Sequence, residues 1–177
     1  MNTDLIRTTP IGTSIYCWLS QADTEFNPNG VFHVEVQFNK EEVQEDKTAV
    51  NRAIAKMVAE YHKSHPNQTG QIKRAPLPYK ENGEKITFKF KSKFKPRLWD
   101  KEQKEIGSDI SVWKGSTMKV RYKLNPYNQN IGVGCTLYIQ DVQIKDLIKA
   151  SGGDNGACPF PKIEGSALPA REEKAVY

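Results

Sequence analysis

Two stretches of this sequence place basic side chains at every second position. In the first, lysine occupies the odd positions of residues 89–95, while the even positions of residues 86–94 are apolar except for Ser92. The second, residues 118–124, alternates in the same way. Because successive side chains of a strand point to opposite faces, each stretch predicts an apolar core face and an outer row of cations about 7 Å apart. The outward cations are Lys89, Lys91, Lys93, Lys95, Lys119, Arg121 and Lys123.

The charge of the chain is distributed unevenly. The net charge is +5 over 177 residues, but residues 71–125 hold 15 Lys and Arg against 6 Asp and Glu, whereas residues 20–62 hold 4 against 8. Positive charge concentrated in one region is the electrostatic footprint of a nucleic-acid-binding protein. On charge alone, a basic face that contacts only solvent is the alternative.

Binding of single-stranded nucleic acid without sequence preference also requires flat rings on which bases stack. Tyr16 and Trp18 alternate with the aliphatic side chains from Ile11 to Leu19, so they face outward if the aliphatic side chains form the core face. The alternative is that a loop or the helix covers these two rings, so that they are not exposed to solvent. The stacking candidates are Tyr16, Trp18, Trp99, Trp113, Tyr127 and Tyr138.

Other aromatic side chains share a face with aliphatic ones and are predicted to lie in the core. These are Phe88, Phe90, Phe94 and Tyr122. Arg97 follows the first basic stretch closely and joins the predicted phosphate contacts. Trp113, beside Lys114 and Gly115, either stacks on a base or plugs one end of a barrel.

The remaining strands follow the same alternation. In residues 31–38 the apolar side chains are expected to face inward, and His33 is expected to face solvent. Residues 131–144 predict the last long strand, in which the apolar set moves from odd to even positions near residues 140–141. Such a change of register suggests a β-bulge, and the glycines near the start of this strand allow another backbone to approach closely.

A single apolar stripe predicts an amphipathic helix over about residues 47–63, capped by Asp46 or Thr48. About five strands and one helix favour a mainly β fold, an OB-type five-stranded Greek-key barrel, with a β-sandwich as the alternative. From residue 151 the chain is rich in Gly and Pro. We therefore expect one domain over residues 1–150 and a flexible C-terminal tail over residues 151–177.

Several function classes find no support in the sequence. The phosphate-binding, serine-hydrolase and zinc-protease motifs do not occur, and the acids of residues 100–109 lie in a Lys-rich stretch typical of a solvated face. We therefore predict no catalysis, metal or cofactor. No membrane span or secretory signal is predicted, and the three dispersed cysteines fit a reducing cytoplasm. An RNA-binding protein, or a structural virion or scaffold protein, is the alternative function.

Four segments together resemble a known family. They are Gly132-Val133-Gly134-Cys135-Thr136-Leu137-Tyr138-Ile139-Gln140-Asp141-Val142-Gln143-Ile144, Trp113-Lys114-Gly115-Ser116, the basic strand 117–124, and Ala22-Asp23-Thr24-Glu25-Phe26-Asn27-Pro28-Asn29-Gly30-Val31-Phe32. This pattern, over roughly residues 10–148, is similar to the single-stranded DNA-binding proteins of bacteriophages, typified by the replication protein of short-tailed phages.

The resemblance implies an OB fold and sequence-independent binding of single-stranded DNA in replication, recombination and repair in the host cell cytoplasm. It also implies an acidic C-terminal tail that ends in an aromatic residue, contacts phage replication proteins and competes with DNA for the basic groove. The resemblance further implies that the protein is a monomer or a homodimer. This chain does end in Tyr177, but residues 151–177 hold 4 acids and 3 bases, which departs from the family's acidic tail.

Overall fold

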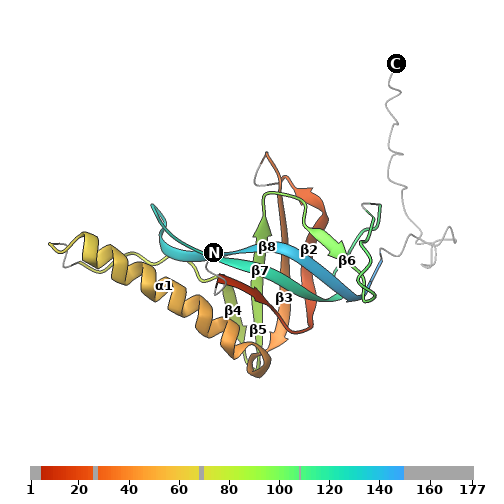
Figure 1. Ribbon diagram of the computed structural model, residues 1–177, viewed down its shortest axis with the longest axis horizontal. Coiled ribbons are helices and arrows are strands. Elements are labelled where there is room, and N and C mark those ends of the chain that lie inside the picture. Colours follow the sequence, from red (N-terminus) through yellow and green to blue (C-terminus); the bar gives the residue numbers. More distant parts are fainter. Residues whose placement is uncertain (1–4, 26–27, 68–69, 108, 150–177) are drawn as a thin grey trace, which may run out of the picture.

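The computed structural model describes residues 5–25, 28–67, 70–107 and 109–149 (Figure 1). The predicted tail, residues 151–177, lies outside this described part. Within it, no helix is long and apolar enough to cross a membrane. The elements in chain order are β1 (Ile6–Thr8), β2 (Gly12–Asp23), β3 (Val31–Asn39), the 3-10 helix η2 (Lys40–Val43), α1 (Gln44–Ser64), β4 (Tyr79–Asn82), β5 (Lys85–Ser92), β6 (Arg97–Trp99), β7 (Thr117–Gln129) and β8 (Gly132–Asp146).

Strands β2, β3, β5, β8 and β7 close into a barrel in that order. Neighbouring strands pair antiparallel, except β5 and β8, which run parallel. The closing pair joins β7 to the start of β2 at Gly12 and Thr13. The OB-type barrel with one helix is therefore confirmed. Strand β1 lies beside β7, β4 beside β5, and β6 continues the edge of β8 beyond β5.

The long β7–β8 hairpin carries the predicted bulge. Arg121 pairs with Asp141, but the next residue, Tyr122, pairs with Ile139, so Gln140 is the extra residue. Ile139 and Val142 consequently both face the core. Near the hairpin tip, Gly132 has a φ of +117°, and a Cβ there would lie 2.6 Å from the carbonyl oxygen of Lys73. This close approach confirms the expectation for the first glycine of β8.

The core contains most of the predicted aromatic side chains. Phe88, Phe90 and Tyr122 are fully buried. The prediction for Phe94 is wrong, because its side chain is 82% exposed. Strand β5 ends at Ser92, whose hydroxyl donates to the carbonyl oxygen of Phe94 (2.6 Å) and accepts from its N–H (3.2 Å). The alternation therefore stops before Phe94.

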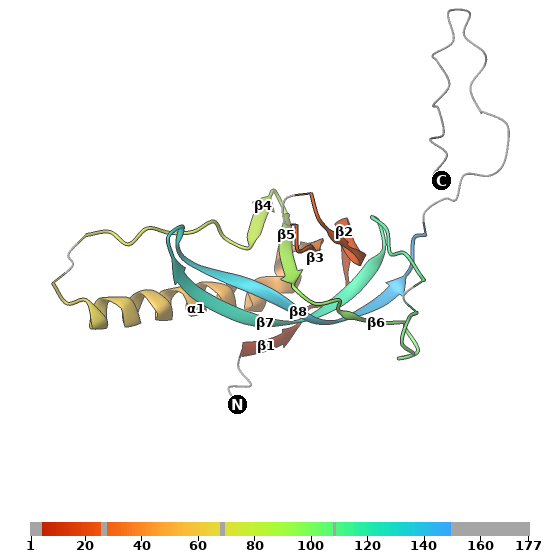
Figure 2. The same cartoon turned by 90° about the horizontal axis from the view of Figure 1, so that it is seen from above.

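Helix α1 begins earlier than expected and is not capped by Asp46. It is preceded by η2, and Asp46 is 5% exposed within the first turn. Val50 and Ile54 belong to the barrel's core cluster. Figure 2 shows α1 running alongside the β7–β8 hairpin, which curves past the rest of the barrel toward the helix C-terminus.

Two predictions about the first two long strands are wrong. Ile11 is 41% exposed rather than buried, because β2 begins at Gly12 and changes register with β3 between Ser14 and Tyr16. His33 is only 6% exposed, because the ring of Tyr16 lies against it with the two ring centroids 5.3 Å apart. Tyr16 itself faces outward as expected.

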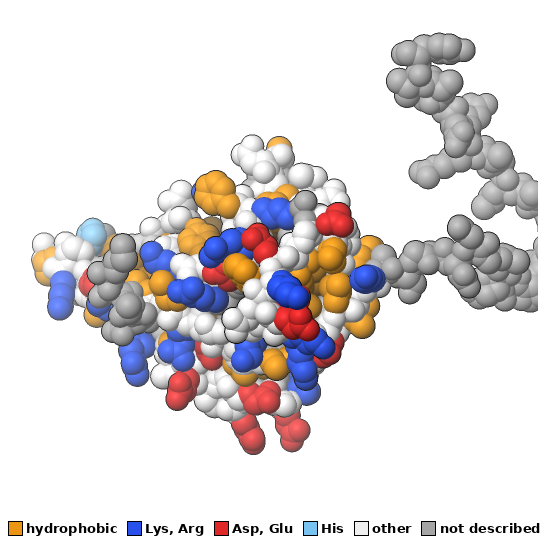
Figure 3. Space-filling model, turned by 45° about the vertical axis from the view of Figure 1, so that its right-hand side comes forward, with side chains coloured by type: hydrophobic (Ala, Val, Ile, Leu, Met, Phe, Trp, Pro, Cys, Tyr) orange, Lys and Arg blue, Asp and Glu red, His pale blue; other side chains and the backbone are white. Residues whose placement is uncertain are grey.

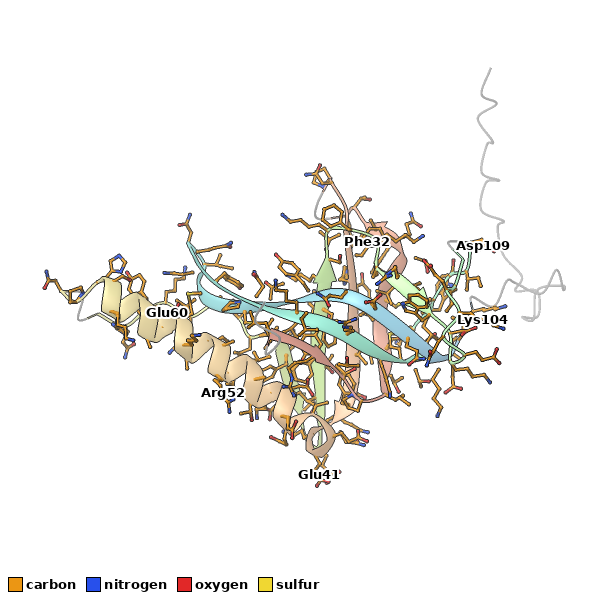
Figure 4. All side chains as sticks on the ribbon, in the orientation of Figure 1. Phe32, Glu41, Arg52, Glu60, Lys104 and Asp109 are labelled. Carbon is orange, nitrogen blue, oxygen red and sulfur yellow. The ribbon has the colours of Figure 1, made fainter. Side chains whose placement is uncertain are left out.

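The charged loop after β6 is solvent-facing, as its composition predicts. Figure 4 shows Lys104 and Asp109 at the end of the molecule opposite the C-terminal end of α1.

Candidate nucleic-acid interface

A row of outward-directed positions crosses the whole barrel. The strand register aligns Trp18 with His33, His33 with Lys91, Lys91 with Tyr138, and Tyr138 with Lys123. Neighbouring strands are about 4.8 Å apart, so these five positions span about 20 Å. His33 is covered, while the two lysines are exposed and the two predicted rings are half-buried. We call this set, with its neighbours Tyr16 and Lys89, the lysine–aromatic row.

Tyr16 and Lys89 belong to a second, shorter line of paired positions beside the first. Tyr16 pairs with Glu35, and Glu35 pairs with Lys89. A carboxylate oxygen of Glu35 lies 3.4 Å from the Lys89 ammonium, so one acid partly neutralises this line. Tyr16 is 43% exposed, which leaves one ring surface of this line open to solvent.

His33 and Asp23 form a buried pair, and the ring of Tyr16 lies against His33. Nε2 of His33 lies 2.9 Å from Oδ2 of Asp23, and the hydrogen bond from His33 lowers the pKa of the Asp23 carboxyl. Asp23 also accepts from the N–H of Glu25, which ties down the end of β2. This pair was missed from the sequence because Asp23 lies in turn-forming sequence and His33 alternates with core residues.

A groove of about 330 Å³ lies beside Lys89 and Lys91. It is also lined by Tyr127 and by Leu77 and Ile131, both of which are about half exposed. Partial desolvation, reinforced by the charge of Lys89, lowers the pKa of Lys91. The groove therefore combines cations with apolar surface.

Tyr127 owes its place in the groove to a glycine on the paired strand. Tyr127 pairs with Gly134 in the β7–β8 hairpin. A Cβ at position 134 would lie 2.6 Å from the Tyr127 hydroxyl oxygen, so any other residue there would displace the ring.

A second group lies further along β8, centred on Asp141. One carboxylate oxygen of Asp141 is 2.9 Å from Nη2 of Arg97 and accepts from the indole N–H of Trp99 at 3.2 Å. The other oxygen is 3.8 Å from Nη1 of Arg121. The Arg97 guanidinium lies 5.4 Å from the centre of the Trp99 ring, within cation–π range. We call Arg97, Trp99, Arg121 and Asp141 the arginine–tryptophan site.

The carboxylate of this site is much less exposed to solvent than its cations. The side chain of Asp141 is 15% exposed, whereas those of Arg97 and Arg121 are 62% and 53% exposed. Lys119 and Trp99 flank Gln143 in the next register position, and together they line a shallow hollow of about 410 Å³. Asp141 thus holds the cations from behind while they remain open to an anion. Its role was missed, although the predicted bulge is adjacent to it.

The two groups form one surface because β8 lies between the two basic stretches. Strands β5 and β6 border one edge of β8, and β7 borders the other. Figure 3 shows Lys and Arg side chains interspersed with hydrophobic and acidic ones across one face of the molecule. Cations and flat rings, the two elements that single-strand binding requires, therefore share this surface.

Not every candidate belongs to this surface as predicted. Lys93 and Lys95 are exposed but lie in the loop after β5, so the first row of cations on a strand stops at Lys91. Trp113 is 49% exposed, so it does not plug a barrel end. It belongs to the segment before β7, where its N–H donates to the carbonyl oxygen of Ile148 at 3.2 Å and its own carbonyl accepts from the Ser14 hydroxyl. Its ring therefore stands on this segment rather than on a strand of the row, although Ser14 of β2 anchors its backbone.

Comparison with known proteins gives the family. Residues 11–147 match the family model described as single-stranded DNA-binding protein, bacteriophage T7. The chain belongs to this family. A single-stranded DNA-binding protein of Enterobacteria phage T3 is 28% identical, over 84% of this chain and 78% of that protein.

Solved structures support the same fold. The crystal structure of gp2.5, a single-stranded DNA-binding protein of bacteriophage T7, matches with a TM-score of 0.65 and 24% identity, covering 86% of this chain and 98% of that one. The single-stranded DNA-binding protein of bacteriophage Enc34 in complex with single-stranded DNA matches with a TM-score of 0.59 and 13% identity, covering 85% and 91%.

Proposed function

We propose that this protein binds single-stranded DNA without sequence preference and acts in phage DNA replication, recombination and repair. Membership of the phage single-stranded DNA-binding family, over residues 11–147, is the observation that carries this proposal. The surface along β8 supplies a physical mechanism for it, because cations there can neutralise phosphates while exposed rings stack on bases. Coating a strand in this way removes hairpins and needs no catalytic step.

The proposed phosphate contacts are the cations on either side of β8, namely Lys89, Lys91, Arg97, Lys119, Arg121 and Lys123, with Lys93 and Lys95 on the adjoining loop. The proposed stacking rings are Tyr16, Trp18, Trp99, Tyr127 and Tyr138. Trp113, on the segment before β7, is a further proposed stacking ring. Duplex DNA should bind less well, because its bases are hidden within the stack.

The cellular setting follows from this function. We propose that the protein works in the host cell cytoplasm, as a monomer or homodimer, and meets phage replication proteins there. The boundary near residue 150, between a DNA-binding domain and a C-terminal tail that contacts those proteins, is part of the same proposal.

The test is a fluorescence titration of the full chain with oligo(dT), at low and high salt, against duplex DNA and oligo(U) of equal length. We expect salt-sensitive binding that favours the single DNA strand, with a slope of about −0.7 per phosphate contact in a plot of log affinity against log salt. Tryptophan quenching would support stacking. Absence of binding at low salt would overturn the proposal, and preference for oligo(U) would move it to RNA.

A further inference from the structure

The most exposed aromatic side chain with large apolar area in the described part of the chain is Phe94. Its side chain is 82% exposed, whereas Phe88 and Phe90 of the preceding strand are fully buried. Single exposed apolar side chains are common on protein surfaces, so the exposure of Phe94 gains meaning only from how its backbone is held and from the cations beside it.

The loop that carries Phe94 is anchored rather than free. The Ser92 hydroxyl, in a residue that is 8% exposed, bonds to both the N–H and the carbonyl oxygen of Phe94. Pro96 on the other side is buried. The backbone on both sides of Phe94 is therefore fixed, and the ring is held outward between the exposed cations Lys93 and Lys95.

The position of the loop joins the two halves of the candidate interface. Lys91, before the loop, pairs with Tyr138 on β8, and Arg97, after it, pairs with Asp141. These two positions on β8 are about 10 Å apart at the usual rise per residue. The six-residue step from Lys91 to Arg97 covers a three-residue step on β8, so the loop has spare length with which to project from the sheet.

We propose that Phe94 stacks on a base of a bound single strand, and that residues 93–96 carry the strand from the lysine–aromatic row to the arginine–tryptophan site. This inference rests on the proposed function. Lys93 and Lys95 would contact the phosphates on either side of the stacked base. A base offers a π-face whatever its identity, so this contact is sequence-tolerant.

Three substitutions at one position separate stacking from other roles. Phe94→Ala removes the ring, Phe94→Leu keeps apolar bulk without a π-face, and Phe94→Trp keeps a larger ring and adds a fluorophore. Ile11→Ala is the matched control, because Ile11 is also apolar and exposed but lies immediately before β2. Since Phe94 is solvent-exposed, we expect all four variants to unfold at the wild-type temperature.

The measurement is fluorescence anisotropy with labelled oligo(dT) of increasing length and the full chain. We expect Phe94→Ala and Phe94→Leu to weaken binding of long oligonucleotides by about fivefold or more, as loss of one stacked base predicts. The loss should shrink for oligonucleotides too short to reach from the row to the loop. Phe94→Trp should bind like the wild type, with additional fluorescence quenching, and Ile11→Ala should change nothing.

The outcomes distinguish this inference from the function on which it rests. Wild-type affinity of Phe94→Ala at every length would overturn the role of the ring. If Phe94→Leu alone kept wild-type affinity, the ring would be an apolar contact and stacking would be wrong. Failure of the wild type itself to bind oligo(dT) would instead refute the proposed function.

Discussion

Two aspartates in this molecule each hold arginine and an aromatic side chain, yet they do so in opposite surroundings. Asp46 is 5% exposed and accepts from the Tyr122 hydroxyl at 2.5 Å and from Nε of Arg7 at 3.1 Å. Asp141 contacts two arginines, both more than half exposed, and the indole N–H of Trp99. The same types of contact are therefore buried around Asp46 and largely exposed to solvent around Asp141.

The difference lies in what each cluster joins. The Asp46 cluster connects helix α1 to β1 and β7, and the Tyr122 hydroxyl and Nε of Arg7 both donate to the buried carboxylate. The Asp141 cluster connects β6 to β7 through β8 and leaves guanidinium surface free. A buried polar group left without its partner costs far more than a solvated one. We therefore infer that Asp46 mainly stabilises the fold, whereas Asp141 mainly sets the net charge of the exposed surface around Arg97 and Arg121.

The largest expected effect is on the folding of an Asp46→Ala variant. The buried Tyr122 hydroxyl loses its acceptor and the partly buried Arg7 loses its partner, so we expect about 2–4 kcal/mol less stability. Chemical denaturation measures it. Asp141→Ala is the matched variant and should cost no more than about 1 kcal/mol, because its arginines remain solvated. Equal losses from the two substitutions would contradict the comparison.

The next effect concerns the exposed cations of the lysine–aromatic row. Replacing both Lys89 and Lys91 with Ala should weaken binding to oligo(dT) by about tenfold or more at low salt. The salt slope should flatten by about 1.4, the contribution of two phosphate contacts on a single strand. The paired control, Lys56→Ala with Lys63→Ala, removes the same charge from the exposed surface of α1. A similar loss from both pairs would mean that only net charge matters.

Alternation in the sequence predicted much of this architecture. The five barrel strands, the bulge near Gln140 and the burial of Phe88, Phe90 and Tyr122 all follow from the period of two and its one interruption. These features depend only on which face of each strand is buried, and the alternation of apolar and polar residues within one strand indicates that face.

The remaining features depend on which strands become neighbours. Nothing local indicates that Asp141 would lie between Arg97 and Arg121, or that Tyr16 would cover His33. Phe94 was misplaced because the alternation of residues 86–94 continues past Ser92 in sequence, while the strand ends there. A side-chain hydrogen bond that turns the backbone leaves no mark on the hydrophobic period.

A smaller effect follows from removing the charge of Asp141 while keeping its shape. In Asp141→Asn the amide oxygen can still accept from Trp99, but the carboxylate no longer offsets Arg97 and Arg121. We expect affinity for oligo(dT) at low salt to rise about two- to fivefold, with a steeper salt dependence. Titration of both proteins across a salt series tests this. Weaker binding would instead show that the carboxylate is needed to orient the arginines.

The smallest effect concerns a third carboxylate, Asp23, whose partner His33 lies against the ring of Tyr16. Its pKa is lowered in the folded state, chiefly by the hydrogen bond from His33. A lowered pKa stabilises the fold above the unfolded value of about 3.9 and loses that contribution as pH falls through the folded value. The stability advantage of the wild type over Asp23→Asn should therefore shrink as pH falls below about 4.

Denaturation at several pH values measures this advantage, with Glu60→Gln on the exposed surface of α1 as the control. If the stability advantage of the wild type stayed the same at the lowest pH, the negative charge of Asp23 would not be what stabilises the fold. The contrast between a stabilising carboxylate and a charge-setting one would then rest on Asp46 and Asp141 alone.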